Sequence, residues 1–179
     1  MEPPGSSGHA HETGMTSEEE PHFSGAFPSH LFETQSEILI EDKRWHCHVP
    51  RVTTLIQRAV AQCADTGHQP GSVVLSCDRV VKRLNGIHRG KHRPTNVLTF
   101  DPPPGFPGGD IILALETVVR EAHRAKKPVG DHLAHLIIHG NLHLAGYDHH
   151  HPGEARTMEM RESLLLSRLG ISNPWKPRS

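Results

Sequence analysis

The chain of 179 residues has no apolar run of the length that a membrane-spanning helix needs. Its first residues lack the charged and then apolar pattern of a secretory signal peptide. It has only three cysteines, Cys47, Cys63 and Cys77, and no two of them form a CxxC pair. These absences favour a cytoplasmic protein with reduced thiols, no membrane partner and no cysteine-based metal site. We expect His46-Cys47-His48 at the surface, because adjacent side chains on an extended chain point to opposite sides.

Basic residues are missing from the first 36 positions, which contain six Glu and no Lys, Arg or Asp. The rest of the chain has 19 basic and 14 acidic residues, a net charge of +5. Segment 1–36 is rich in Gly, Pro, Ser and His, and it has too few apolar residues to offset the entropy of ordering. We therefore predict a disordered acidic tail over 1–36, a folded domain over 37–172 and a C-terminal tail over 173–179.

The chain has no internal repeat, and its hydrophobic periodicity alternates between short strands and amphipathic helices. Pro50 suits the first turn of a helix that Gly67 ends, and we expect Asp78 and Asp131 to cap later helices. Strands are predicted over 36–40, 72–76, 96–100 and 110–113, and helices over 50–66, 78–85, 116–126, 131–144 and 153–169. This order predicts an α+β fold, a small four-stranded mixed sheet packed with about five helices.

Three histidines follow one another closely in the segment His139-Gly140-Asn141-Leu142-His143-Leu144-Ala145-Gly146-Tyr147-Asp148-His149. His139 and His143 are four residues apart on an apolar helix, so their imidazoles lie on one face. Gly146 permits a left-handed turn that can bring His149 back over this face. Three nitrogen ligands with a fourth position left for water are typical of catalytic zinc, so we predict one zinc ion per chain. The predicted metal site thus lies on a helix and the turn after it.

Two residue patterns of other zinc hydrolases are missing. A protease with HExxH carries its general-base Glu directly after the first histidine, where this chain has Gly140. The HxE and PCxxC pattern of the zinc deaminases is also absent. A phosphodiester is the remaining substrate class. Zinc lowers the pKa of its bound water toward about 7, and the resulting hydroxide can hydrolyse a phosphodiester if cations offset the charge on the phosphoryl oxygens.

Acidic residues are absent between Arg79 and Arg93, a segment with six basic residues. Within it, Arg89 is our candidate catalytic residue, because a planar guanidinium can hold a phosphate through two hydrogen bonds. We expect Lys91, Arg93 and Arg83 to contact the phosphates of a nucleic-acid backbone as diffuse positive charge; an ordinary solvated surface is the alternative for Arg83.

Two blocks of the sequence resemble the YbeY family. The segment from His139 to His149 is similar to its motif HGxLHLxGYDH without a mismatch. The segments Leu84-Asn85-Gly86-Ile87-His88-Arg89-Gly90 and Pro94-Thr95-Asn96-Val97-Leu98-Thr99-Phe100 are similar to LNxxYRG and PTNVLSF, with His88 in place of Tyr and Thr99 in place of Ser. The resemblance covers residues 37–172, which it marks as a YbeY-like metallohydrolase domain.

This resemblance implies a zinc-dependent, single-strand-specific endoribonuclease, with zinc held by His139, His143 and His149 and with Arg89 near the metal. It further implies a cytoplasmic role in processing ribosomal RNA, at the 3′ end of 16S RNA, and in ribosome assembly and quality control. The implied partners are ribosomal RNA and the small ribosomal subunit with its proteins.

Two further residues are candidates for orienting the metal ligands. Asp148 can accept a hydrogen bond from a ligating imidazole, or it can simply stabilise the turn. His135 lies one turn before His139, where it can support a ligand or fill the core.

Two other functions stay open. The chain can be a ribosome-assembly factor that needs zinc for folding and does not cut RNA, or a zinc hydrolase that acts on peptides or a small molecule. The oligomeric state and the general base are not determined by the sequence, and three histidines also suit nickel, cobalt or iron.

Overall fold

The computed structural model describes residues 36–175 and contains one four-stranded sheet. The strands lie in the order β1-β2-β4-β3, and only β3 runs antiparallel to its neighbour. The bounds are Glu37–Ile40 for β1, Ser72–Ser76 for β2, Val97–Phe100 for β3 and Asp110–Ala114 for β4. Each predicted strand is therefore present, within one residue at either end.

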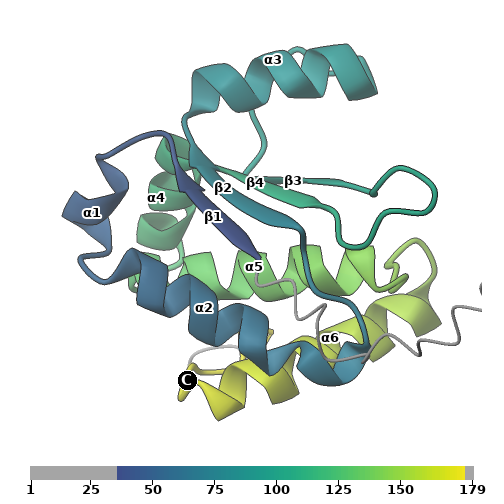
Figure 1. The fold of residues 1–179 in the computed structure, drawn as a ribbon. Helices are drawn as coiled ribbons and strands as arrows, with labels where there is room; N and C mark the ends of the chain where they lie inside the picture. The colour runs from purple at the N-terminus through teal and green to yellow at the C-terminus, as the bar shows by residue number, and fades with distance from the viewer. Residues whose placement is uncertain (1–35, 176–179) are drawn as a thin grey trace, which may run out of the picture. The chain divides into compact units, whose positions relative to one another are not determined.

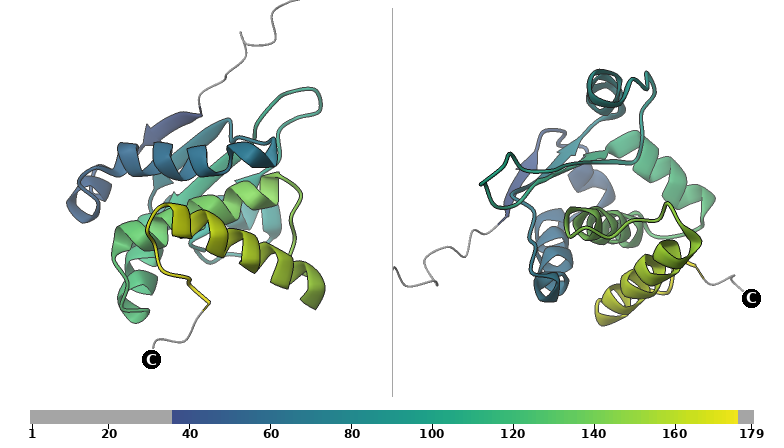
Figure 2. Two further views of the ribbon diagram at one scale, coloured as in Figure 1. Left: turned by 90° about the horizontal axis from the view of Figure 1, so that it is seen from below. Right: turned by 90° about the vertical axis from the view of Figure 1, so that its right-hand side faces the viewer.

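Six α-helices and one short 3₁₀ helix accompany the sheet within the described residues. The α-helices are α1 (Trp45–His48), α2 (Val52–Gln62), α3 (Asp78–Arg89), α4 (Leu115–Arg124), α5 (Val129–Leu144) and α6 (Pro152–Arg168), and η2 (Ala64–Thr66) follows α2. Helix α3 covers one face of the sheet, and α2, α4 and α5 lie on the other (Figure 1). Helix α6 packs against α5 (Figure 2). The predicted α+β class with a mixed four-stranded sheet is confirmed.

The two faces of the sheet have separate cores of very different size. On the α5 face, buried side chains of α2, α5 and α6 pack with those of β2 and β4, among them Ile56, Leu75, Ile111, Ile137 and Leu166. On the α3 face, the buried apolar side chains among the described residues are only Val81, Leu98 and Ala114, with partly buried neighbours around them. Since apolar burial is the main stabilising contribution, the α5 face supplies most of the stability of this domain.

Gly140 allows α5 to pack directly on the sheet. A Cβ at this position would lie 3.1 Å from Cγ2 of Thr99 and 3.2 Å from Cγ2 of Ile111. A Glu at position 140 would therefore point into the packed interface with the sheet. The residue that the HExxH arrangement requires would therefore be crowded by the side chains of the sheet.

The segment His46-Cys47-His48 is helical, so the predicted extended conformation is wrong, although the expected surface placement is correct. These residues form most of α1, and all three are exposed. Trp45 anchors this turn, because its side chain is buried and its Nε1 donates a hydrogen bond to the carbonyl of Ser76. A single helical turn has no repeating apolar pattern, which is why the sequence did not indicate it.

Helix α3 continues through Asn85 and Gly86, where the sequence predicted its end. It ends instead at Gly90, whose φ of 67° is the left-handed conformation of a helix stop. Gly86 has a different function, since a Cβ there would lie 2.8 Å from Nδ1 of His92. The glycine permits close approach of the following loop to the helix.

The caps of α3 and α5 also differ from the prediction. Helix α5 begins at Val129, because the carbonyl of Pro128 accepts the N–H of His132, and Asp131 lies in the first turn rather than at the cap. Asp78 does not cap its own helix. Its carboxylate accepts the N–H of Thr117 in α4, and Glu116 of α4 accepts the N–H of Asp78. Helices α3 and α4 therefore cap each other.

No helix in the span 36–175 is long and apolar enough to cross a membrane. The predicted acidic tail falls on residues 1–35, outside the described part of the chain, apart from Ser36.

Candidate metal centre

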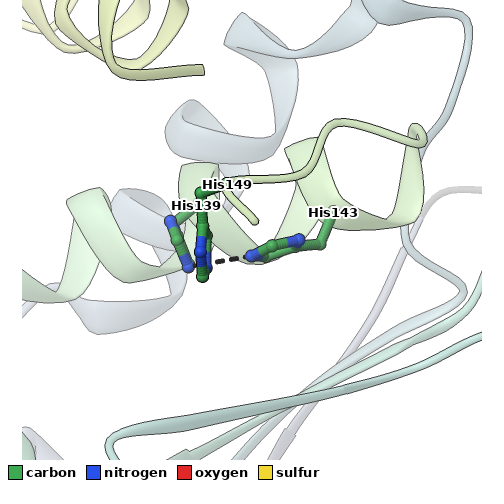
Figure 3. A group of neighbouring side chains, drawn as sticks. All are labelled: His139, His143 and His149. Atoms are coloured by element: carbon green, nitrogen blue, oxygen red, sulfur yellow. Dashed lines mark hydrogen bonds between the residues drawn. The ribbon is translucent and has the colours of Figure 1, made fainter. Parts of the chain in front are cut away.

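The rings of His139, His143 and His149 converge on one point (Figure 3). Each offers a ring nitrogen, and the three nitrogens lie within 4.8 Å of one another. The closest pair is Nε2 of His139 and Nε2 of His143, which are 3.1 Å apart. The ring of His149 stacks on that of His139, with centroids 5.7 Å apart and planes 23° from parallel.

The end of α5 explains why His149 reaches the other two rings. Gly146 has a φ of 84°, its N–H bonds to the carbonyl of His143, and the N–H of Tyr147 bonds to the carbonyl of Leu142. This pair of hydrogen bonds is a Schellman motif, which reverses the chain at a glycine. The carboxylate of Asp148 then accepts the N–H of His149 at 2.7 Å and fixes the turn that carries the third histidine.

The three rings suit a zinc ion. Zinc–nitrogen bonds of about 2.1 Å at tetrahedral angles separate the ligand nitrogens by about 3.4 Å, close to the 3.1 Å between the first two histidines. Nδ1 of His139 lies 2.7 Å from a carboxylate oxygen of Glu162, which places the proton on Nδ1 and leaves the lone pair of Nε2 free for a metal.

The surroundings of His143 favour the neutral form that a metal requires. Burial lowers its pKa, and so do the neighbouring His139 and His149. A backbone hydrogen bond with Tyr147 acts in the opposite direction. Burial and the neighbouring histidines thus favour the neutral imidazole, which has the lone pair that a metal ligand needs.

Sequence reasoning did not identify Glu162, although this residue touches the centre directly. Its side chain is 1% exposed, and it accepts hydrogen bonds from His139 and His135. Burial raises the pKa of this carboxyl group, but the two histidines lower it more, to about 2. One signal was present in the sequence, because Glu162 is an acidic residue on the apolar side of α6, four residues after Met158 and three before Leu165.

The two predicted supporting residues lie in different places. His135 contacts Oε2 of Glu162 at 3.1 Å, so a single carboxylate separates it from the ligand candidate His139. Asp148 bonds to the backbone of His149 and pairs with the ring of His150, and no contact with a ligating ring is found among the described residues. Asp148 also lines the pocket in front of the three rings.

The pocket in front of the three histidines has a volume of about 450 Å³, and Arg89 forms part of its wall. Arg89 is the last residue of α3, and its guanidinium donates a hydrogen bond to the carbonyl of Thr99 at 3.3 Å. Another part of the wall comes from β3 and the loop before it, including Thr95 and Asn96. Arg89 precedes each of the three histidines by 50 residues or more in the chain, and the structure brings all four side chains to one cavity.

The other predicted RNA-binding residues divide into two groups. Lys91 and Arg93 line a second pocket that shares Arg89, Thr95 and Asn96 with the first. Arg83 is exposed on α3 and lines neither pocket. RNA binding by these residues stays a prediction.

Known proteins with similar sequences identify the family. Residues 33–170 match the family described as "Endoribonuclease YbeY". The chain belongs to the YbeY family. A protein named "Endoribonuclease YbeY" from Gluconobacter oxydans is 50% identical over 147 residues, which are 79% of this chain and 88% of that protein. A relative with the same name from Rhodopseudomonas palustris is 39% identical over 168 residues, 87% of this chain and 88% of its own length.

A solved structure supports the same fold. The solution structure of TM1509 from Thermotoga maritima matches with a TM-score of 0.53 and 24% identity, and the match covers 80% of this chain and all of that one. The match to the family and the two named relatives confirm the predicted family and the predicted enzyme class, a nuclease.

Proposed function

We propose that this YbeY family member is a zinc-dependent endoribonuclease that cuts single-stranded RNA. One observation carries the proposal: three converging imidazoles and a guanidinium line the same pocket. The ligands would be His139, His143 and His149, and the cation would be Arg89. The absence of a Glu at position 140 supports a phosphodiester rather than a peptide as the substrate.

The residues of the pocket have separable tasks. A bound zinc ion would supply a Lewis acid and a nucleophilic water at neutral pH. Arg89 would hold a non-bridging oxygen of the phosphate and offset the negative charge that grows on it during the reaction. The carbonyl of Thr99, which accepts a hydrogen bond from Arg89, would keep the guanidinium over the pocket.

The proposed substrate is ribosomal RNA, with cleavage at the 3′ end of 16S RNA during maturation of the small ribosomal subunit, and the proposed compartment is the cytoplasm. The resemblance to the YbeY family supports this context. The excess of positive charge over residues 37–179, 19 basic against 14 acidic side chains, supports a polyanionic partner. The domain boundaries at residues 37 and 172 are part of the same proposal.

Cleavage of a short single-stranded RNA by the purified full chain tests the proposal. A His143→Ala preparation, made identically, shows whether the activity belongs to this pocket. His123→Ala, an exposed histidine on α4, is the matched control and should cut as fast as the parent. We expect cleavage by the parent and by His123→Ala, and none by a folded His143→Ala variant.

Two outcomes would contradict the proposal. Equal cleavage by all three preparations would mean that a contaminating nuclease is present. No cleavage of the short RNA, and none of small-subunit particles carrying 16S RNA with an extended 3′ end, would favour an assembly factor that needs zinc only for folding.

A further inference from the structure

A second pocket adjoins the first and contains two cations that the sequence did not single out. It has a volume of about 300 Å³ and shares Arg89, Thr95 and Asn96 with the pocket of the three histidines. Its far wall is formed by α4, which contributes Arg120 and Arg124. The two pockets together form a continuous lining that runs from the three histidines past Arg89 to α4.

The second pocket has a strong excess of positive charge. Five basic side chains line it: Arg89, Lys91, Arg93, Arg120 and Arg124. Among the described residues, Glu121 is the one carboxylate that lines it, and Oε2 of that residue already accepts hydrogen bonds from Asn96 and His132, both at 3.0 Å.

Most of these cations have no anionic partner. Arg120 lies 3.7 Å from Asp78. Lys91, Arg93 and Arg124 form no ion pair with any residue in the span 36–175. A concave surface with unpaired cations attracts an anionic ligand.

The loop that presents Lys91 and Arg93 is held in place. Asn85 is buried, with 3% of its surface exposed, and its Nδ2 donates a 2.7 Å hydrogen bond to the carbonyl of Arg93. The carbonyl of Asn85 accepts the N–H of Lys91 at 3.2 Å. Because the backbone of this loop is already ordered, binding an anion costs little additional backbone entropy.

We propose that the second pocket binds a backbone phosphate of the RNA strand, next to the phosphate that is cut in the first pocket. Arg89 stands on the shared wall and separates the two phosphates. This subsite rests on the proposed function, since it takes its ligand from the same strand. It would select a polynucleotide over a mononucleotide, because only a strand can fill both pockets.

Binding of a fluorescein-labelled 12-nucleotide 2′-O-methyl RNA, which resists cleavage, to the full zinc-loaded chain tests the subsite. We expect Arg124→Ala to weaken binding about 5-fold at low salt and to reduce the slope of log affinity against log salt by about one. Arg58→Ala removes the same charge from an exposed position on α2, outside both pockets, and should change affinity less than about 2-fold.

Unchanged binding by Arg124→Ala, or an equal loss with Arg58→Ala, would overturn the subsite. Competition separates the sources of the phosphate. If inorganic phosphate or uridine monophosphate displaces the RNA at a concentration as low as the dissociation constant of the RNA, the pocket binds a small ligand rather than a strand. The assay needs no cleavage, so a parent that binds through Arg124 but never cuts would contradict only the nuclease proposal.

A second proposal rests on a different observation, the carboxylate of Glu162. Both of its oxygens are in use: Oε1 accepts from Nδ1 of His139 at 2.7 Å, and Oε2 accepts from His135 at 3.1 Å and from Nε1 of Trp175 at 3.0 Å. The rings of His135 and Trp175 pack edge to face, with centroids 5.8 Å apart. The carboxylate therefore has a single orientation, with one oxygen committed to the ring of His139.

We infer that Glu162 is a positioning residue for the metal ligand His139, and that His135 and Trp175 hold it in place. Glu162→Gln keeps the shape of the side chain but replaces one of its two accepting oxygens with an amide nitrogen, which donates. The affinity for zinc, measured by competition with a chromophoric chelator, should fall about 10- to 100-fold. Trp175→Phe should reduce it less, since one oxygen of Glu162 would still hold the ligand.

A purely structural role would give a different result. Glu159→Gln, on the same helix and without a described partner, is the matched control and should leave zinc affinity unchanged. The visible absorption of the cobalt-substituted protein should change in Glu162→Gln and not in Glu159→Gln. Wild-type zinc affinity and an unchanged cobalt spectrum in Glu162→Gln would overturn the inference.

Discussion

Helices α3 and α5 lie on opposite faces of one sheet, and they are held in different ways. Helix α5 is embedded, with eight buried residues and contacts to α2, α4, α6 and the sheet. Helix α3 has two buried residues, Val81 and Asn85, and is capped at its N-terminus by Glu116 of α4. The candidate metal ligands His139 and His143 lie on the embedded helix, whereas Arg89 is at the exposed end of the other.

This difference shows that the domain places the metal ligands on its most rigid helix and the phosphate-binding cation where solvent can reach it. Metal ligands must stay in place to within a fraction of an ångström, and a fully packed helix provides that. A phosphate-binding cation must meet a large ligand from solvent, and the end of a lightly packed helix leaves it accessible. Four experiments would break or sharpen this comparison.

The largest expected effect is on activity, at the exposed end of α3. Arg89→Ala should slow cleavage of single-stranded RNA by about 1000-fold, because it removes a cation that acts on charge developing in the transition state. Arg89→Lys should recover only part of this loss, since an ammonium cannot bind two oxygens in one plane. The unfolding temperature should stay near that of the parent, because Arg89 is exposed.

Arg83→Ala is the comparison within the same helix, because this residue is exposed and outside both pockets. It should change the rate less than about 3-fold. A loss equal to that of Arg89→Ala would mean that the general charge of α3 matters rather than the position of Arg89.

The second experiment compares the two cores by their stability. Ile137→Ala on α5, where the side chain is fully buried, should lower the free energy of unfolding by about 3 kcal/mol. Leu84→Ala on α3, where the side chain is only partly buried, should lower it by about 1 kcal/mol. Urea denaturation of both variants measures the difference, and equal losses would refute the unequal contribution of the two faces.

The third experiment removes the metal. Zinc at about 100 times its dissociation constant should stabilise the folded chain by about 2.7 kcal/mol, so a chelator should lower the unfolding temperature. Hydrogen exchange should show where this stability is gained, with slower exchange of α5 amides on zinc addition and little change in α3. Uniform slowing in both helices would mean that zinc controls global folding.

The smallest effect concerns the reciprocal caps of α3 and α4. Burial raises the pKa of Glu116, but hydrogen bonds from the N–H of Asp78 and from Arg44 lower it below its ordinary value. A carboxylate with a lowered pKa in the folded state adds stability above its unfolded pKa of about 4.3, and this is lost as the pH falls through the folded value.

Glu116→Gln should therefore cost less than about 1 kcal/mol at pH 7, because the side chain is partly solvated. The difference from the parent should stay constant down to about pH 4.5 and shrink at lower pH. Urea denaturation at pH 7, 5 and 3 measures it. A difference that grows on acidification would show that another group controls the acid stability of this helix pair.

The elements that the sequence predicted well are those with a repeating local pattern. The four strands, the amphipathic helix before Gly67 and the metal-bearing helix have such patterns, and their bounds agree with the structure within a few residues. The errors are at places without one. Helix α1 is a single turn anchored by the burial of Trp45, and α3 passes through Gly86 because the glycine makes room for His92.

The sequence by itself determined the family and the spacing of His139 and His143 on one helical face, because a helix repeats every 3.6 residues wherever it lies. The glycine stop that brings His149 back is equally local. Only the tertiary structure decided which distant groups meet these residues. Glu162 reaches His139 because α6 packs on α5, and Arg120 and Arg124 share a pocket with Arg89 because α4 and the end of α3 both line the space beside Thr95 and Asn96. These contacts between residues on different helices depend on how the helices pack, and the local periodicity of the sequence does not encode the packing.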